Sequence, residues 1–146
     1  MKYNSLIIIP TYNEAENIEL IINKIISIDN SNDVLVVDDN SPDGTSEIVN
    51  NLNNIHDSRV FLIKRDKKSG LGSAYRTGFK WALDNKYSYI FQMDADMSHD
   101  PNEIKNLKIQ LTQNKYDFVI GSRYIEGVSV VLSLIHISEP TRQDSI

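Results

Sequence analysis

The sequence predicts an α/β fold with a mostly parallel sheet and helices on both faces. Short, continuous apolar runs alternate with longer segments whose apolar residues recur at helical spacing. Continuous apolar runs are typical of strands buried on both faces, and a β-α-β-α-β order favours parallel strands joined by crossover helices. At 146 residues the chain is long enough for one domain with one core.

The first half of the chain supplies two strand–helix units. Residues 6–9 are an apolar run ended by Pro10, which predicts a short buried strand. Residues 14–28 carry isoleucines at helical spacing, with acidic residues near the start, where the helix dipole favours them. Residues 33–38 predict a second buried strand, and a Ser-Pro-Asp-Gly turn leads from it to a helix over residues 45–53.

The second half continues this alternation. Strands are predicted over residues 60–64, 89–93 and 117–120, because each is a short apolar run bounded by polar or turn-forming residues. Helices are predicted over 74–85 and 101–114, and the second of these begins with a proline, which suits the first turn of a helix.

The composition is that of an ordinary globular protein, with 40% hydrophobic and 24% charged residues. The net charge of −5 argues against a general nucleic-acid-binding protein, which needs a basic face, but leaves a nucleotide ligand open. No cysteine is present, which excludes disulfides, zinc thiolates and cysteine nucleophiles. The first apolar run is too short for a signal peptide and no run reaches the ~20 residues of a membrane span. A cytoplasmic protein is therefore expected, with contact to a membrane surface left open.

Carboxylates directly follow two of the predicted strands. Open α/β sheets bind ligands at the carboxyl ends of their strands, so Asp38-Asp39 and Asp94-Ala95-Asp96 are expected to share one site. Two carboxylates one residue apart suit Mn²⁺ or Mg²⁺, which keep further positions for diphosphate oxygens, although a solvated loop is the alternative. Asp39 is favoured over Asp38 as the acceptor for a ribose hydroxyl or a base N–H, with the other carboxylate capping the turn.

The loops after the first, third and fifth strands offer further contacts. Tyr12 presents a flat face for a nucleobase and Glu14 an acceptor, while core packing and a helix-terminal charge are the alternatives. Lys67 and Lys68 lie in a basic loop, and Arg123 follows a glycine break; all three are candidates for binding phosphate.

Two neighbouring features are given structural roles instead. The Gly70-Leu71-Gly72 turn is a poor match to a dinucleotide-binding fingerprint, because Tyr75 occupies a position that needs glycine or alanine. His99 lies next to the acidic pair, but a contact at the start of the following helix is favoured over metal ligation.

Together these motifs resemble those of the family 2 glycosyltransferases, and specifically the polyprenyl-phosphate (dolichol-phosphate) mannose synthases. The matching stretches, spread over residues 7–127, are IIIPTYNEAENI, VLVVDDNSPDGT, GLGSAYRTGF, MDADMSHDP and DFVIGSRYIEG. The resemblance implies a Rossmann-like GT-A fold, a GDP-mannose donor, a Mn²⁺ or Mg²⁺ cofactor and a polyprenyl phosphate acceptor. It also implies that the full-length protein lies at the cytoplasmic face of a membrane.

The resemblance assigns site residues as well. The nucleoside pocket is expected to contain Pro10, Tyr12, Glu14, Val37 and Asp39. The metal and the diphosphate are expected at Asp94, Ala95 and Asp96, with the two carboxylates as metal ligands and Arg123 on the phosphate side. Ser98 stands where some relatives have glutamine as a further ligand, so it is expected to ligate only weakly or through water. Asp94, Asp96 and Arg123 are the implied catalytic residues.

The C-terminal segment departs from this pattern. Residues 1–130 are interpreted as the nucleotide-sugar-binding part of a GT-A catalytic domain that is incomplete at its C-terminus and lacks the acceptor half. Residues 131–146 continue no predicted element and resemble the adapter-derived tails of some assembled reading frames. We expect them to be non-native, with an irregular native tail as the alternative.

The expected reaction is an inverting transfer of mannose from GDP-mannose to a polyprenyl phosphate. An acceptor phosphate is already anionic and needs no general base, so positioning and charge stabilisation supply the catalysis. Two alternatives stay open: a family 2 transferase that uses a UDP-sugar for polysaccharide or lipid-linked sugar synthesis, and a nucleotide-binding module without activity.

Overall fold

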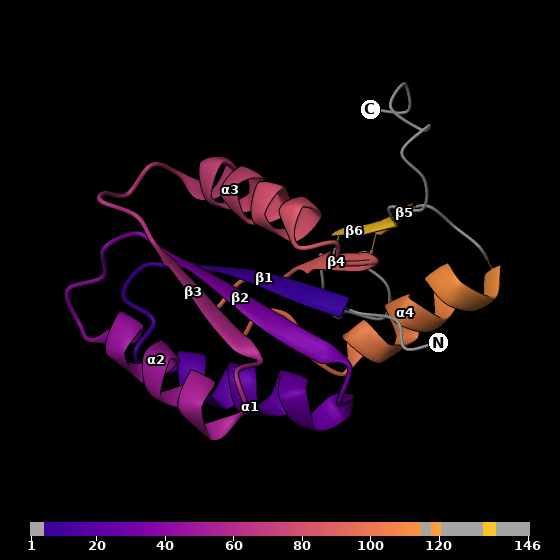
Figure 1. The fold of residues 1–146 in the computed structure, drawn as a ribbon, viewed down its shortest axis with the longest axis horizontal. Coiled ribbons are helices and arrows are strands. Elements are labelled where there is room, and N and C mark those ends of the chain that lie inside the picture. The colour runs from indigo at the N-terminus through magenta and orange to yellow at the C-terminus, as the bar shows by residue number, and fades with distance from the viewer. Residues whose placement is uncertain (1–4, 115–117, 121–132, 137–146) are drawn as a thin grey trace.

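A computed structural model describes residues 5–114, 118–120 and 133–136 of the chain. In chain order its elements are β1 (Ser5–Thr11), α1 (Ile18–Ile28), β2 (Asn32–Asp38), α2 (Thr45–Ile55), β3 (Val60–Lys64), α3 (Leu71–Asp84), β4 (Tyr89–Gln92), α4 (Glu103–Asn114), β5 (Phe118–Ile120) and β6 (Ser133–His136). The strands form one sheet in the order β3-β2-β1-β4-β6-β5, with helices on both faces (Figure 1). Within these ranges no helix is long and apolar enough to cross a bilayer.

The sheet is parallel around its centre, which confirms the predicted fold class. β1 pairs in parallel with β2 and β4, and β2 pairs in parallel with β3. The exception is β6, which is antiparallel to both β4 and β5, so that β5 runs in the same direction as the first four strands.

Strand β6 lies within residues 131–146, for which the sequence analysis expected no element. That expectation was wrong for Ser133–His136. The edge of β4 offers backbone groups that need hydrogen-bond partners, and a strand of this length is enough to pair them. The remainder of the segment lies outside the described residues, and its non-native origin stays a prediction.

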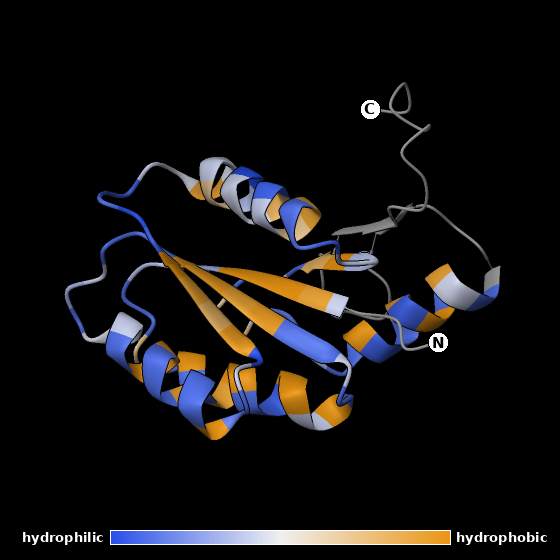
Figure 2. Cartoon of the chain, in the orientation of Figure 1, coloured by the Kyte–Doolittle hydropathy of each residue, from blue (hydrophilic) through white to orange (hydrophobic). Residues whose placement is uncertain are grey.

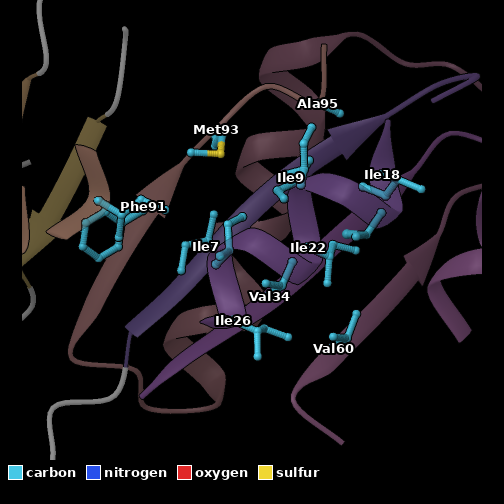
Figure 3. Packing of buried hydrophobic residues seen from close by; sticks show 14 of the residues in the cluster. Ile7, Ile9, Ile18, Ile22, Ile26, Val34, Val60, Phe91, Met93 and Ala95 are labelled. Atoms are coloured by element: carbon cyan, nitrogen blue, oxygen red, sulfur yellow. The ribbon is translucent and has the colours of Figure 1, made fainter. Parts of the chain in front are cut away.

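Alternation along β1 sends its side chains into two cores. Ile7 and Ile9 are fully buried against α1, α2 and α4, in a cluster that includes Phe91 (Figure 3). Leu6 and Ile8 are fully buried on the opposite face, against α3. Figure 2 shows the consequence: the central strands are hydrophobic along most of their length, and the helices carry both hydrophobic and hydrophilic surfaces.

Helix α1 begins later than the sequence analysis predicted. The expected helix started at Glu14, whereas α1 starts at Ile18. The N–H groups of Asn17 and Ile18 donate to the Glu14 carbonyl at 3.1 and 2.9 Å, so a turn precedes the helix. This turn keeps Glu14 beside the end of β1.

Helix α3 packs on the sheet through small residues. Ala74, Gly78 and Ala82 are buried and recur every fourth position, on one face of the helix. A Cβ placed on Gly78 would lie 2.5 Å from Ile8 Cγ2 and 3.0 Å from Ile8 Cδ1. The missing side chain at this position therefore sets how closely α3 approaches β1.

Gly78→Ala is expected to destabilise the fold. The added methyl group overlaps Ile8, so the helix or the isoleucine must shift, and overpacking of this kind costs about 1–3 kcal/mol. Urea denaturation measures the change in the free energy of unfolding. Gly72→Ala is the matched control, because its added Cβ meets only the end of Arg76, at 3.7 Å. Equal stability of the two variants would contradict the close-packing account.

Candidate functional site

A cleft of about 260 Å³ lies at the carboxyl edge of the sheet. The chain runs outward from β1 through β2 to β3, and then places β4 on the other side of β1. Open α/β sheets bind ligands where the strand order reverses in this way. The lining brings together the predicted site residues Pro10, Tyr12, Glu14, Asp39 and residues 94–96.

Backbone hydrogen bonds extend the sheet into the walls of the cleft. The Asp39 N–H donates to the Thr11 carbonyl at 3.0 Å, on one side of β1. The Met93 N–H donates to the Ile8 carbonyl at 3.0 Å, on the other side. The loops after β2 and β4 are thereby held on opposite sides of the end of β1, facing a common space.

Asp38 has a structural role. Its side chain is fully buried and accepts hydrogen bonds from Thr11 Oγ1 at 2.6 Å, from the N–H and hydroxyl of Ser41 at 2.9 and 2.6 Å, and from Ser46 Oγ at 3.1 Å. These bonds tie together the end of β1, the turn after β2 and the start of α2. Of the two adjacent carboxylates, Asp39 is the one that lines the cleft.

Asp39 is held by Arg65 from the end of β3. Arg65 Nε donates to Asp39 Oδ1 at 2.6 Å and Nη2 donates to Oδ2 at 2.9 Å, with both side chains largely buried. The hydrogen bond to Asp39 raises the pKa of Arg65. Such a two-pronged pair fixes the plane of the carboxylate. The Ser69 N–H also donates to Oδ2 at 3.3 Å, so Oδ1 is the oxygen that keeps a further lone pair for a ligand. The sequence analysis did not single out Arg65, whose place beside Asp39 follows only from the pairing of β2 with β3.

The turn after β4 holds the acidic pair through two short contacts. The Asp94 N–H donates to Nδ1 of buried His99 at 3.0 Å. The imidazole of His99 therefore holds the backbone of the acidic turn. The Ser98 N–H donates to Asp96 Oδ1 at 3.0 Å. The contact with Ser98 is the main cause that lowers the pKa of Asp96. Met97 has a φ of 66°, a strained value for a non-glycine residue, and strain of this kind concentrates at functional sites.

Negative charge collects in the cleft. Burial is the main cause that raises the pKa of Glu14, and the charges of Asp96, Asp43 and Asp94 raise it further, against a hydrogen bond with Asn17. Mutual repulsion of this kind favours a bound cation.

The carboxylates of the cleft suit a divalent cation that is bound jointly by the protein and by the phosphates of a substrate. Asp94 and Asp96 offer carboxylate oxygens, which Mg²⁺ and Mn²⁺ prefer. Among the described residues no group of three or more acidic, histidine or cysteine side chains could hold a metal ion by itself. One or two carboxylates completed by substrate phosphates are the usual protein site for Mg²⁺, so the residues present fit the predicted cofactor.

Tyr12 and Lys68 form the outer part of the cleft. The Tyr12 side chain is exposed (40%), and Lys68 Nζ lies 4.7 Å from the centroid of its ring. A ring face that holds a cation is also available for stacking by a flat base. Within the part of the chain that the structure describes, Lys68 is the only basic residue in the lining, whereas Lys67 is not part of it.

Three predicted site residues do not line the described cleft. Val37 is a correction: its side chain is fully buried in the core, because the pleat of β2 points it to the face of the sheet that α3 covers. Ser98 donates its N–H to Asp96 from outside the lining, and its weak or water-mediated ligation of the metal stays a prediction. Arg123 lies outside the described residues, and its role stays a prediction.

Comparison with known proteins assigns the chain to a family. The model of glycosyl transferase family 2 matches residues 6–142, which is most of the sequence. The chain belongs to glycosyl transferase family 2. The family resemblance carried by the sequence motifs is thereby confirmed.

Curated relatives of this family 2 chain are named for mannose transfer. It is 44% identical over 126 residues to the polyprenol monophosphomannose synthase of Mycolicibacterium smegmatis and 41% identical over 126 residues to the undecaprenyl-phosphate mannosyltransferase of Micrococcus luteus. It is also 41% identical over 129 residues to the dolichol-phosphate mannosyltransferase of Pyrococcus furiosus. These matches cover 86%, 86% and 85% of the chain but 47%, 51% and 34% of the relatives. The chain thus spans about half the length of the first two.

Solved structures identify the fold as that of the GT-A glycosyltransferases. A mannosyltransferase of Pyrobaculum calidifontis in complex with GDP-Man and Mn²⁺ superposes with a TM-score of 0.71 at 21% identity, covering 93% of this chain and 45% of that one. The glucosyl-3-phosphoglycerate synthase of Mycobacterium tuberculosis with Mn²⁺, UDP-glucose and phosphoglyceric acid gives 0.63 at 15% identity, covering 92% and 57%. At such identities the likeness concerns the fold alone.

Proposed function

We propose that the full-length protein transfers mannose from GDP-mannose to a polyprenyl phosphate, with inversion at the anomeric carbon, and that this chain supplies the donor site. The observation that carries the proposal is the single cleft in which Tyr12, Asp39, Asp94 and Asp96 meet. The names of the curated relatives support mannose as the sugar and a polyprenyl phosphate as the acceptor. The solved mannosyltransferase complex supports GDP as the nucleotide.

In this proposal the β1 and β2 sides of the cleft bind the nucleoside. Tyr12 stacks on the base, and Glu14, held beside the end of β1, accepts a hydrogen bond from a base N–H. Asp39 accepts hydrogen bonds from the ribose, in the plane that Arg65 fixes. Lys68 leaves the Tyr12 ring when the base arrives and binds a phosphate oxygen, since it is a compact, flexible cation at the rim.

The β4 side binds the diphosphate. Asp94 and Asp96 would hold Mn²⁺ or Mg²⁺, with Pro10 and Ala95 shaping the wall between them and the nucleoside. The bound cation supplies a Lewis acid that offsets charge on the departing diphosphate. The residues of the chain contribute to catalysis by orienting the donor and by holding its leaving group in place. Arg123 is proposed to add a further positive charge on the phosphate side.

The transfer forms one bond and breaks one. An oxygen of the acceptor phosphate attacks the anomeric carbon of mannose from the face opposite the diphosphate. The bond between that carbon and the diphosphate oxygen breaks, and its electron pair leaves with GDP. The attacking oxygen is already anionic, so no residue has to remove a proton. Orientation and electrostatic stabilisation are then the main contributions of the protein.

The acceptor is a membrane lipid, which sets the place of the reaction. We propose that the full-length protein lies at the cytoplasmic face of a membrane, because nucleotide sugars reach the cleft from the aqueous side while a polyprenyl chain stays in the bilayer. Flotation of the full-length protein with polyprenyl phosphate vesicles tests whether it binds a membrane surface, and a protein that stays in the aqueous fraction contradicts the placement at a membrane.

The choice of base is tested by nucleotide affinity. With Mn²⁺ present, isothermal titration calorimetry of the chain is expected to give at least about tenfold tighter binding of GDP than of UDP, a difference of about 1.4 kcal/mol. The physical reason is that guanine offers a larger stacking surface to Tyr12 and more N–H donors to the acceptors around it. Metal-free titrations are the control. Tighter binding of UDP would instead support a UDP-sugar transferase, in line with the UDP-glucose complex among the solved neighbours.

A further inference from the structure

Helix α3 carries a tyrosine to the acidic turn after β4. The Tyr75 hydroxyl donates a hydrogen bond to Asp94 Oδ1 at 2.8 Å. Tyr75 lies one turn before Gly78, whose missing side chain lets α3 approach β1. Its ring packs against the core cluster on that face of the sheet. The contact with Asp94 therefore depends on the close packing of α3 and links that packing to the cleft.

The direction of this hydrogen bond is fixed. A tyrosine hydroxyl holds its proton at neutral pH, because its ordinary pKa is about 10, so the phenol is the donor in this contact. An ionised carboxylate only accepts hydrogen bonds. Asp94 Oδ1 thus uses one of its two lone pairs to accept the hydrogen bond from Tyr75.

The second oxygen of Asp94 has a different environment. Asp94 Oδ2 lies 3.9 Å from His99 Nε2, beyond hydrogen-bonding distance, and 36% of the Asp94 side chain stays exposed at the cleft. The backbone of Asp94 is held independently, by its N–H donating to His99 Nδ1. The carboxylate is therefore restrained at the main chain and at one oxygen, while the other oxygen stays available.

We propose that Tyr75 is a positioning residue for the metal site: its hydrogen bond to Oδ1 of Asp94 fixes the orientation of the carboxylate and so favours Oδ2 as the oxygen that ligates the cation. This inference rests on the proposed function, because it takes Asp94 to be a metal ligand. Side chains that hydrogen-bond to a metal-binding carboxylate fix its orientation and tune its affinity. Without the hydroxyl, the carboxylate can rotate and its two oxygens become equivalent competitors for the cation.

Tyr75→Phe tests the inference, with Tyr87→Phe as the matched control. The Tyr87 hydroxyl donates to Asp33 Oδ2 at 2.7 Å, and its ring packs against the same core cluster, yet neither Tyr87 nor Asp33 lines the cleft. Each variant thus removes one hydroxyl and one tyrosine–aspartate hydrogen bond. Thermal melts report the effect of that loss on stability, and calorimetry reports the affinity for GDP with and without Mn²⁺. Electron paramagnetic resonance of Mn²⁺ in the GDP complex reports the symmetry of its ligands.

Tyr75→Phe is expected to weaken Mn²⁺-dependent GDP binding by about 10- to 100-fold, the usual effect of removing such a partner, and to alter the Mn²⁺ spectrum. Metal-free GDP binding should not change, and Tyr87→Phe should lower the melting temperature without either effect. Unchanged Mn²⁺ affinity and spectrum in Tyr75→Phe overturn the inference, provided that Asp94→Asn abolishes metal-dependent binding. If Asp94→Asn itself binds Mn²⁺ and GDP normally, the metal assignment of the proposed function fails, and the inference fails with it.

Discussion

Asp94→Asn is expected to abolish metal-dependent binding of GDP to the chain. The substitution keeps the shape of the side chain but removes the charge that attracts the cation. Even the outer-shell partners of metal ligands contribute about 10- to 100-fold in affinity, so loss of the ligand itself should exceed about 100-fold. Calorimetric titration of GDP in the presence of Mn²⁺ measures the effect. Metal-free binding, which depends on Tyr12 and Asp39, should be largely retained.

The control for this experiment is Asp84→Asn. Asp84 is exposed at the end of α3 and takes no part in the cleft lining. Its substitution makes the same change in net charge, so any general electrostatic effect on GDP binding appears in both variants. Equal affinity of Asp94→Asn and Asp84→Asn for GDP in the presence of Mn²⁺ would refute the metal assignment.

The same substitution at the neighbouring carboxylates Asp38 and Asp39 is expected to affect two different properties, stability at Asp38 and nucleotide binding at Asp39. Asp38→Asn should reduce the free energy of unfolding by about 3 kcal/mol or more, because hydrogen bonds to a buried charged acceptor contribute about 1.5–3 kcal/mol each. The NH2 group that replaces one carboxylate oxygen cannot accept hydrogen bonds, so at least one of the donors from Thr11, Ser41 and Ser46 loses its acceptor. Urea denaturation measures this loss.

Asp39→Asn should act mainly on nucleotide binding. Its amide keeps one acceptor oxygen for Arg65, but it loses the charge that orients the pair towards the ribose. We expect metal-free GDP affinity to fall by about tenfold, the equivalent of a hydrogen bond of about 1.4 kcal/mol. The folded fraction of Asp38→Asn must be measured first, so that binding is compared per folded molecule. A larger loss of GDP affinity per folded molecule in Asp38→Asn than in Asp39→Asn would contradict the division of roles.

Periodic features of the fold could be predicted from the sequence. The apolar run at residues 6–9 and the isoleucine spacing of α1 depend on neighbours along the chain, so both elements were found. The errors were at the start of α1 and at the ends of β1, which continues through Pro10 to Thr11. The strand-end rule was enough to bring Asp39, Asp94 and Asp96 to one edge. Val37 was placed in the pocket by the family resemblance, which does not say which way a side chain points, although its side chain lies in the core.

Long-range partners could not be predicted. Arg65 is 26 residues from Asp39 and Tyr75 is 19 residues from Asp94, and neither contact leaves a periodic signal. Tyr75 was noted only as a mismatch to a dinucleotide-binding fingerprint. Its role emerges once α3 is seen against the sheet, because the buried face formed by Ala74 and Gly78 determines where the adjacent Tyr75 hydroxyl lies.

The central claim is that Asp39, Asp94 and Asp96 bind one metal-bridged sugar nucleotide in one cleft. A crystal structure of the chain grown with GDP and Mn²⁺ tests it most directly. The account predicts the cation between the diphosphate and the carboxylates of Asp94 and Asp96, with the ribose at Asp39. A nucleotide bound elsewhere on the surface, or a cation without contact to either Asp94 or Asp96, would contradict it.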